Sequence, residues 1–277
     1  MCRCRSVNRR QFLSRLGWTA GSGLAWAAGC QSAPETGRKQ LLLVPESQEM
    51  TLGAQAFESV QTEAKPSTNQ RMIQTVKRVG ERISQQADRS DFDWQFELFA
   101  SDEQNAFCLP GGKVAVYEGI LSVCQNEAGL AVVMSHEIAH ALARHGGERM
   151  SQSMAVDGVK QIANRLAKKH VPTREEMLMQ AYGVGSQYLV LLPYNRKQES
   201  EADHIGIMLM SRAGYDPAEA PRFWKRFSTQ KSEQPIEFLS THPSDERRAD
   251  DLLALMEEAQ TNYRNSPQLG LGLPLNS

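Results

Sequence analysis

The chain has 277 residues, a length that allows one large domain or two small ones. Its charge is nearly balanced, with 31 Lys and Arg against 32 Asp and Glu, which gives no electrostatic reason to expect nucleic acid binding. No repeat of solenoid length stands out in the sequence, so a repeat architecture is not expected.

The first 30 residues have the features of an export signal. Asn8–Leu13 (NRRQFL) is a twin-arginine pattern, and the apolar run Leu16–Ala28 is too short to span a membrane. Small residues then precede Cys30, as in a bacterial lipoprotein cleavage box, which predicts Cys30 as the lipidated first residue of the mature protein. By its resemblance to Gram-negative lipoproteins, Gln31 after Cys30 would fit an outer-membrane lipoprotein at the periplasmic face. Cleavage near Ala28, which would leave a soluble periplasmic protein, is the alternative.

Residues 31–46 are predicted to form a flexible tether, because Ser, Pro, Gly and charged residues are frequent there. Apolar residues at helical spacing then predict helices over about residues 47–64 and 67–87.

Three strands are expected next. Alternating apolar residues predict a strand over 92–100, and Pro110-Gly111-Gly112 predicts a turn between strands 105–109 and 113–117. The strand that ends before Pro110 suits the edge of a sheet, where an extended peptide can be added as a further strand. An ordinary hairpin is the alternative.

A helix expected over residues 127–144 contains the candidate metal-binding and catalytic residues. His136 and His140 are four residues apart, just over one helical turn, so both rings project from one face. Two neutral imidazoles placed in this way can bind one zinc ion, and Glu137 can then act as general base towards water. The helix is apolar nearly all round and is therefore predicted to be buried, where His and Glu need partners such as a metal.

The metal helix is expected to end at Gly146-Gly147, with His145 at the surface; a position behind a metal ligand is the alternative. Residues 148–190 predict two helices separated near Pro172. Glycines and Pro193 bracket the apolar segment 183–193, which is interpreted either as a mobile flap or as a buried apolar turn.

A second group of acidic residues enters an apolar helix after residue 196. Glu199 and Asp203 lie one turn apart on one face, so Glu199 can bind the metal while Asp203 hydrogen-bonds a ligand histidine. Glu201 lies about 200° away around the helix, and periodicity alone leaves open which glutamate faces the zinc. A charged first turn favoured by the helix dipole is the alternative for all three.

The C-terminal part predicts a turn at Gly214–Pro217, a further helix, the motif Thr241-His242-Pro243 and a last helix to about Asn262. Residues 263–277 are expected to be a flexible tail. Cys108 and Cys124 either form a disulfide or remain as two buried thiols.

Four motifs in this order together resemble metallopeptidase family 48, the gluzincin zinc endopeptidases that include HtpX, the CAAX prenyl proteases and BepA-like enzymes. They are the Asn105–Gly112 segment, the His-Glu-x-x-His pattern, Glu199 four residues before Asp203, and the Thr-His-Pro motif with a following Arg. The resemblance covers about residues 47–260. Unlike HtpX, the sequence has no apolar membrane spans, and unlike BepA it has no tetratricopeptide-like domain after the peptidase region.

The resemblance implies His136, His140 and Glu199 as ligands of one zinc ion and Glu137 as the general base. It thereby selects Glu199 over Glu201, and it places Asp203 beside a ligand histidine.

It further implies that His242 is a fourth ligand or a latch that holds the enzyme at rest, and that Arg248 lies near the active site. Asn105 and Ala106 would lie on the substrate-binding edge strand.

The predicted fold is α+β, a mainly helical zincin domain over residues 47–262 with a small antiparallel sheet before the metal helix. The predicted function is a zinc endopeptidase of the cell envelope that cleaves unfolded or misfolded proteins in quality control, attached to the membrane through a lipid at Cys30. A zinc-stabilised periplasmic chaperone or scaffold, which holds polypeptides without cleaving them, is the alternative. The sequence does not indicate the oligomeric state.

Overall fold

The computed structural model of the protein describes residues 30–166, 195–229, 238, 241–242 and 248–275. Residues 1–29 of the predicted export signal and the candidate flap over residues 183–193 therefore lie outside the described residues. No helix within the described ranges combines the length and the apolar character needed to cross a membrane.

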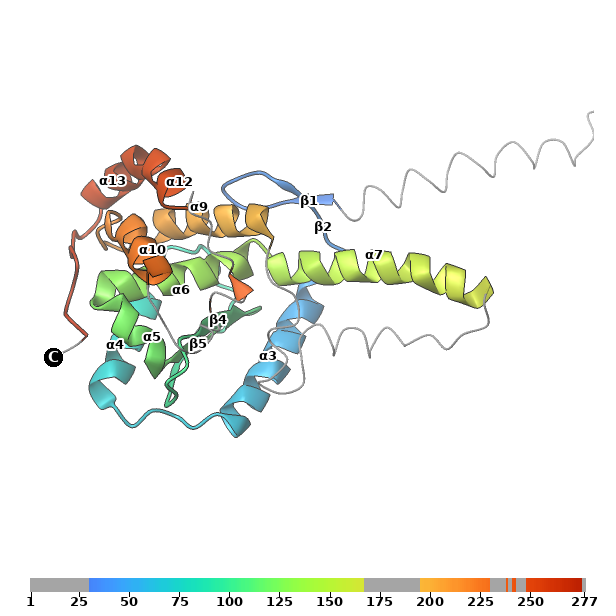
Figure 1. Cartoon of the computed structure of the whole chain (residues 1–277), viewed down its shortest axis with the longest axis horizontal. Coiled ribbons are helices and arrows are strands. Elements are labelled where there is room, and N and C mark those ends of the chain that lie inside the picture. The colour runs from blue at the N-terminus through green and yellow to red at the C-terminus, as the bar shows by residue number, and fades with distance from the viewer. Residues whose placement is uncertain (1–29, 167–194, 230–237, 239–240, 243–247, 276–277) are drawn as a thin grey trace, which may run out of the picture.

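Helix α6 (Glu127–Leu142) lies at the centre of the fold, between helix α9 (Arg196–Arg212) and a small sheet (Figure 1). Every residue of α6 is buried, as its apolar character on all sides predicts. The helix begins at the N-cap Asn126, whose side chain accepts a hydrogen bond from the Gly129 backbone nitrogen. Its burial confirms the prediction that this helix is enclosed by the core.

The sheet has the strand order β3-β5-β4, formed by β3 (Gln95–Phe99), β5 (Lys113–Tyr117) and β4 (Ala106–Leu109). Strands β4 and β5 form the expected antiparallel hairpin, whereas β3 runs parallel to β5. The helical fold with this small sheet confirms the predicted α+β class. Strand β4 lies at the edge of the sheet and packs against α6, so one sheet edge adjoins the helix that carries the histidines.

The remaining helices enclose α6 and the sheet. They are α3 (Glu46–Glu63), α4 (Gln70–Ser84), α5 (Glu118–Cys124), α7 (His145–Leu166), α10 (Glu219–Thr229), α12 (Arg248–Ala254) and α13 (Met256–Arg264). Helices α4 and α9 contact α6 directly, and α10 and α12 pack against each other beside it. Helix α7 extends away from the rest of the domain in Figure 1.

Helices α6 and α9 approach closely at Gly206. A Cβ atom at this position would lie 3.2 Å from the backbone nitrogen of His136, closer than most packed side chains allow. The absence of a side chain at Gly206 therefore lets the backbone of α9 lie directly against the start of the histidine motif.

Two segments expected to be flexible are instead packed on the domain. Within residues 31–46, strand β2 (Lys39–Leu41) pairs with β1 (Cys30–Ser32), and this hairpin makes ion pairs to α7 and α9 that a tether could not keep. In the tail, the carbonyl oxygens of Leu271 and Leu273 accept hydrogen bonds from the first residues of α6. These backbone donors have no partner within the helix, and the tail satisfies them.

Cys108 and Cys124 are free thiols, and both are buried. Burial raises the pKa of each thiol, so both remain protonated. The alternative of two buried thiols is therefore the one that the structure supports.

Candidate metal centre

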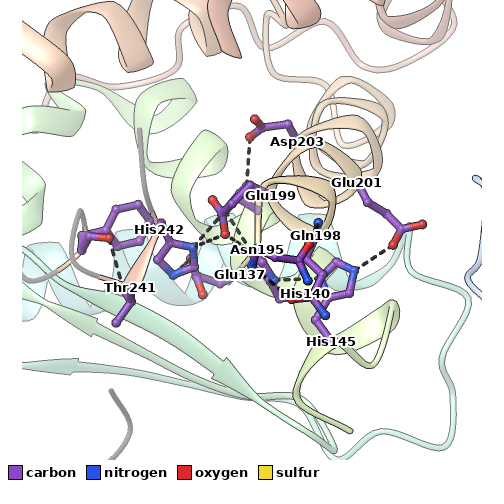
Figure 2. A network of polar contacts seen from close by, with 12 residues as sticks. Glu137, His140, His145, Asn195, Gln198, Glu199, Glu201, Asp203, Thr241 and His242 are labelled. Carbon is purple, nitrogen blue, oxygen red and sulfur yellow. Dashed lines mark hydrogen bonds and ion pairs between the residues drawn. The ribbon is translucent and has the colours of Figure 1, made fainter. Parts of the chain in front are cut away.

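Four side chains that can bind a metal converge in the interior. His136 and His140 come from α6, Glu199 comes from α9, and His242 follows Phe238 and Thr241 in a separate segment. Each offers one ligand atom, and these atoms all lie within 4.8 Å of one another. All four residues are buried, and Figure 2 shows His242 and Glu199 meeting beside Glu137.

The separations of these ligand atoms fit a tetrahedral metal ion. Nε2 of His136 lies 3.1 Å from Nε2 of His140 and 3.3 Å from Nδ1 of His242. Glu199 Oε1 lies 3.3 Å from Nε2 of His140 and 3.1 Å from Nδ1 of His242. Zinc bonds of about 2.0–2.1 Å at tetrahedral angles place two ligand atoms about 3.3 Å apart. The donor set of three imidazoles and one carboxylate is also one that zinc accepts.

Two buried carboxylate oxygens support the same interpretation. Neither Glu137 Oε1 nor Glu199 Oε2 accepts a hydrogen bond from any described residue, although both are fully shielded from solvent. A buried carboxylate oxygen without a donor is costly unless another positive group, such as a metal ion, lies nearby.

Asp203 contacts His136, one of the candidate ligands, and Arg248 in turn binds Asp203. Asp203 Oδ1 lies 3.0 Å from Nδ1 of His136, which leaves Nε2 of that ring directed at the other ligands. Arg248 binds Asp203 through two hydrogen bonds, each 2.7 Å long, and its guanidinium carbon lies 3.6 Å from the centre of the Trp224 ring. Arg248 Nη1 also lies 3.0 Å from Glu199 Oε2, in a charge contact without hydrogen-bond alignment.

Burial and neighbouring charges shift the pKa values of three side chains at the centre, two in the direction that metal binding needs and one against it. Burial alone would raise the pKa of Glu199, but His242, His136 and His140 hold it well below its usual value, so the carboxylate is ionised. Burial lowers the pKa of His140, which keeps that imidazole neutral. Burial also lowers the pKa of His136, but hydrogen bonds to Asp203 and Glu199 outweigh it and raise the pKa to about 9. A metal ion must therefore displace a proton from His136.

Glu137 lies beside the centre without belonging to the group of four. Its Oε1 is 3.4 Å from Nε2 of His242. Burial raises the pKa of Glu137 above the usual value for a carboxyl group. A carboxylate with a raised pKa is a better proton acceptor near neutral pH, as a general base requires.

The structure shows which of the two glutamates faces the candidate ligands, a choice that periodicity left open. Glu199 faces the two histidines of α6, whereas Glu201 faces the other way and accepts a hydrogen bond of 2.9 Å from Nε2 of His145. Burial would raise the pKa of Glu201, but its hydrogen bonds to His145, Thr36 and Arg38 lower it to about 2.

His145 was expected at the surface, and that prediction is wrong. Its side chain is fully buried, and its Nδ1 lies 2.8 Å from Nδ1 of His140. The cause is Arg144, whose positive φ of 53° ends α6 and turns the chain so that α7 starts at His145. Gly146 and Gly147 then lie within α7 instead of ending the metal helix. Ion pairing of Arg144 with Glu49 holds this uncommon backbone conformation.

Asn105 and Ala106 stand where the edge strand begins. Ala106 is the first residue of β4 and is buried, and Asn105 precedes it, with its carbonyl oxygen bonded to the backbone nitrogen of Tyr117. Cys108, two residues along β4, has a thiol pKa that is raised first by burial and then by the Glu137 charge. Strand β4 also packs against α6, the helix that carries Glu137. Cys30, in contrast, is the first residue of β1.

Comparison with known proteins agrees with this geometry. The model of peptidase family M48 matches residues 70–256. The mitochondrial metalloendopeptidase OMA1 of Schizosaccharomyces pombe is 34% identical over 253 residues, which cover 89% of this chain and 72% of that protein. OMA1 of Saccharomyces cerevisiae is 28% identical over 95% of this chain and 79% of its own length. The beta-barrel assembly-enhancing protease of Escherichia coli is 28% identical over 82% of this chain but only 47% of its own length.

The chain belongs to peptidase family M48, so it is an enzyme, a metalloendopeptidase, as its sequence motifs predicted. The prediction of a location at the periplasmic face of a bacterial membrane is wrong. OMA1 relatives from fungi, a plant and vertebrates are mitochondrial proteins, which contradicts that location.

Proposed function

We propose that the enzyme uses one zinc ion, held by His136, His140 and Glu199, to cleave unfolded or misfolded polypeptides in protein quality control. The observation that carries this proposal is the convergence of four candidate ligand atoms within 4.8 Å of one another. Beside them lies the buried Glu137 Oε1, which accepts no hydrogen bond from a described residue. Family membership supports peptide hydrolysis over the alternative of a chaperone or scaffold that holds polypeptides without cleaving them.

The zinc ion would supply Lewis acidity, which would polarise a peptide carbonyl and lower the pKa of a water molecule so that the water could lose a proton as it attacks. Glu137 accepts the proton of the attacking water at its buried Oε1 and then donates it to the leaving nitrogen of the peptide. Asp203 keeps His136 in the tautomer whose Nε2 faces the centre, and Arg248 holds Asp203 in place.

The position of β4 supports an extended substrate. Within the described ranges β4 pairs only with β5, and it packs against α6, which carries Glu137. A polypeptide added along β4 near Asn105 and Ala106 would form backbone hydrogen bonds that do not depend on its sequence. An enzyme that binds in this way needs an unfolded segment, because a folded protein already uses those backbone groups internally.

Metal removal tests the proposal. Purified enzyme is incubated with unfolded casein before and after dialysis against a chelator, and the metal content is measured each time. We expect cleavage to be lost with the zinc and to return when one equivalent of zinc per chain is added back. Cleavage that persists in protein without bound zinc would rule out the assignment.

His242 is expected to act as a latch. Its Nδ1 lies 3.1 Å from Glu199 Oε1, and its Nε2 lies 3.4 Å from Glu137 Oε1. It therefore occupies the position of a fourth ligand, which a catalytic zinc site keeps open. If the unlatched form is populated at about 1–10%, as minor conformers commonly are, His242→Ala should raise the basal cleavage rate about 10–100-fold.

The measurement for His242→Ala is the initial rate of casein cleavage at equal zinc content. Thr241→Ala, on the same turn, is the control and should keep the wild-type rate. A lower rate for His242→Ala with zinc retained would contradict the latch and indicate a catalytic role instead.

Attachment of a lipid at Cys30 stays a prediction. It was inferred from an export signal outside the described residues, and the location at the bacterial periplasm on which it depended is contradicted by the mitochondrial relatives. Cys30 pairs with Leu41 in the β1–β2 hairpin, so any group bound to it would lie close to the peptidase domain.

A further inference from the structure

A second buried polar cluster lies next to the metal centre, at the end of the network opposite His242 (Figure 2). Glu201 lies at its middle and accepts hydrogen bonds from His145, from Arg38 and from Thr36. Nε2 of His145 lies 2.9 Å and Nε of Arg38 lies 2.6 Å from the same oxygen of Glu201. Because a carboxylate with three donors is held as an anion, Glu201 acts only as an acceptor here.

This arrangement determines the proton position on His145. Its Nε2 must carry a hydrogen, because that nitrogen donates to Glu201. Its Nδ1 lies 2.8 Å from Nδ1 of His140, so one of these two nitrogens carries a hydrogen and the other accepts it.

The role of His140 as a metal ligand determines which of the two Nδ1 atoms carries the hydrogen. A neutral His140 that binds a metal through Nε2 must carry its hydrogen on Nδ1, because Nε2 has to present a lone pair. His140 Nδ1 is then the donor, and His145 Nδ1 is the acceptor. The opposite direction would place a hydrogen on Nε2 of His140, among the other ligand atoms, where it would block the metal.

We propose that His145 and Glu201 are positioning residues for the metal ligand His140: Glu201 holds His145 in the tautomer that accepts the Nδ1 proton of His140. The inference rests on the proposed zinc site and extends it. His140 is thereby oriented through a carboxylate and an intervening imidazole, whereas Asp203 contacts His136 directly.

The β1–β2 hairpin takes part in the same arrangement. Arg38 lies between the two strands, and its guanidinium binds Glu201 and also Glu148 of α7, at 2.8 Å. Gln198 of α9 donates a further hydrogen bond of 2.8 Å to Glu148. The N-terminal hairpin, α7 and α9 therefore all contribute to fixing the position of Glu201.

The test measures zinc affinity, by competition with a chelating indicator, for His145→Phe, Glu201→Gln and the double variant. Loss of such a supporting contact typically weakens metal binding about 10–100-fold, and we expect this for each single variant. Because the two residues act in series, the double variant should bind zinc no more weakly than His145→Phe alone. Glu127→Gln is the matched control: it makes the same change at a buried glutamate that pairs with Arg78 instead, and it should keep the wild-type affinity.

The tautomers can be measured in the wild-type protein, which avoids any variant that fails to fold. In the zinc-loaded enzyme, nitrogen–proton correlation spectra of the imidazoles should show His140 protonated at Nδ1 and His145 at Nε2. A hydrogen on Nδ1 of His145 would overturn the inference. The inference would also be overturned if the wild-type enzyme binds zinc and cleaves casein, and both single variants bind zinc with the wild-type affinity. Wild-type protein that binds no zinc would instead overturn the proposed function.

Discussion

Replacing Glu137 by Gln is expected to lower kcat/KM about 10²–10⁴-fold while zinc remains bound. The amide has the size of the carboxylate but cannot accept a proton, and a positioned general base typically contributes a factor of this size. Glu137 is not one of the four clustered ligands, so the zinc content should stay at the wild-type value. The measurement is the initial rate of casein cleavage, with zinc determined in the same samples.

Glu127→Gln provides the matched control, because it makes the same change at another buried glutamate of α6, at the end of the helix away from the histidines. We expect it to keep the wild-type rate. If the latch makes that rate too low to compare, both substitutions are repeated in the His242→Ala background. A Glu137→Gln enzyme that cleaves at the rate of its parent would show that another group is the base.

Replacing Arg248 by Met is expected to lower the free energy of unfolding by about 3–5 kcal/mol, the usual cost of leaving a buried charge without its partner. Arg248 is 4% exposed and is bonded twice to Asp203, which is itself buried. Met fills part of the space against Trp224 but removes both hydrogen bonds to Asp203 and leaves His136 as its remaining charged neighbour. The measurement is urea unfolding of both proteins in the presence of a chelator.

Two further arginine variants show whether the effect is specific. Arg222→Met removes an arginine whose side chain is 51% exposed and 3.3 Å from Asp216, so its cost should stay at about 1 kcal/mol or below. Arg248→Lys keeps the charge but loses the two-pronged hydrogen bond, so we expect an intermediate loss of stability. A cost for Arg248→Met no larger than that for Arg222→Met would contradict the structural role of the Asp203 pair.

Local patterns predicted the core of the site. The spacing of His136 and His140 placed both rings on one helical face, and the apolar character of α6 predicted its burial. Periodicity could not choose between Glu199 and Glu201, because both faces of α9 are buried: one faces the metal ligands and the other faces His145. The resemblance to the family favoured Glu199, and the structure places that residue among the four side chains that could hold a metal.

The contacts that sequence reasoning missed depend on long-range packing. His145 follows His140 by five residues, and in a continuous helix it would point away; the left-handed Arg144 brings the two rings together. The sequence signal was Gly146-Gly147, which was interpreted as a helix end although the turn lies just before it. The short strands of the β1–β2 hairpin carry no clear alternation, and Arg38 is ordered by acids more than 100 residues away.

The division of the ligands between α6 and α9 links the lifetime of the enzyme to its metal supply. An ion bound by both helices acts as a cross-link that exists only in the folded chain. Free zinc at a thousand times its dissociation constant would stabilise the fold by about 4 kcal/mol. Under zinc starvation the population of unfolded molecules would rise, and under the proposed activity on unfolded chains the enzyme would then encounter copies of itself among its substrates.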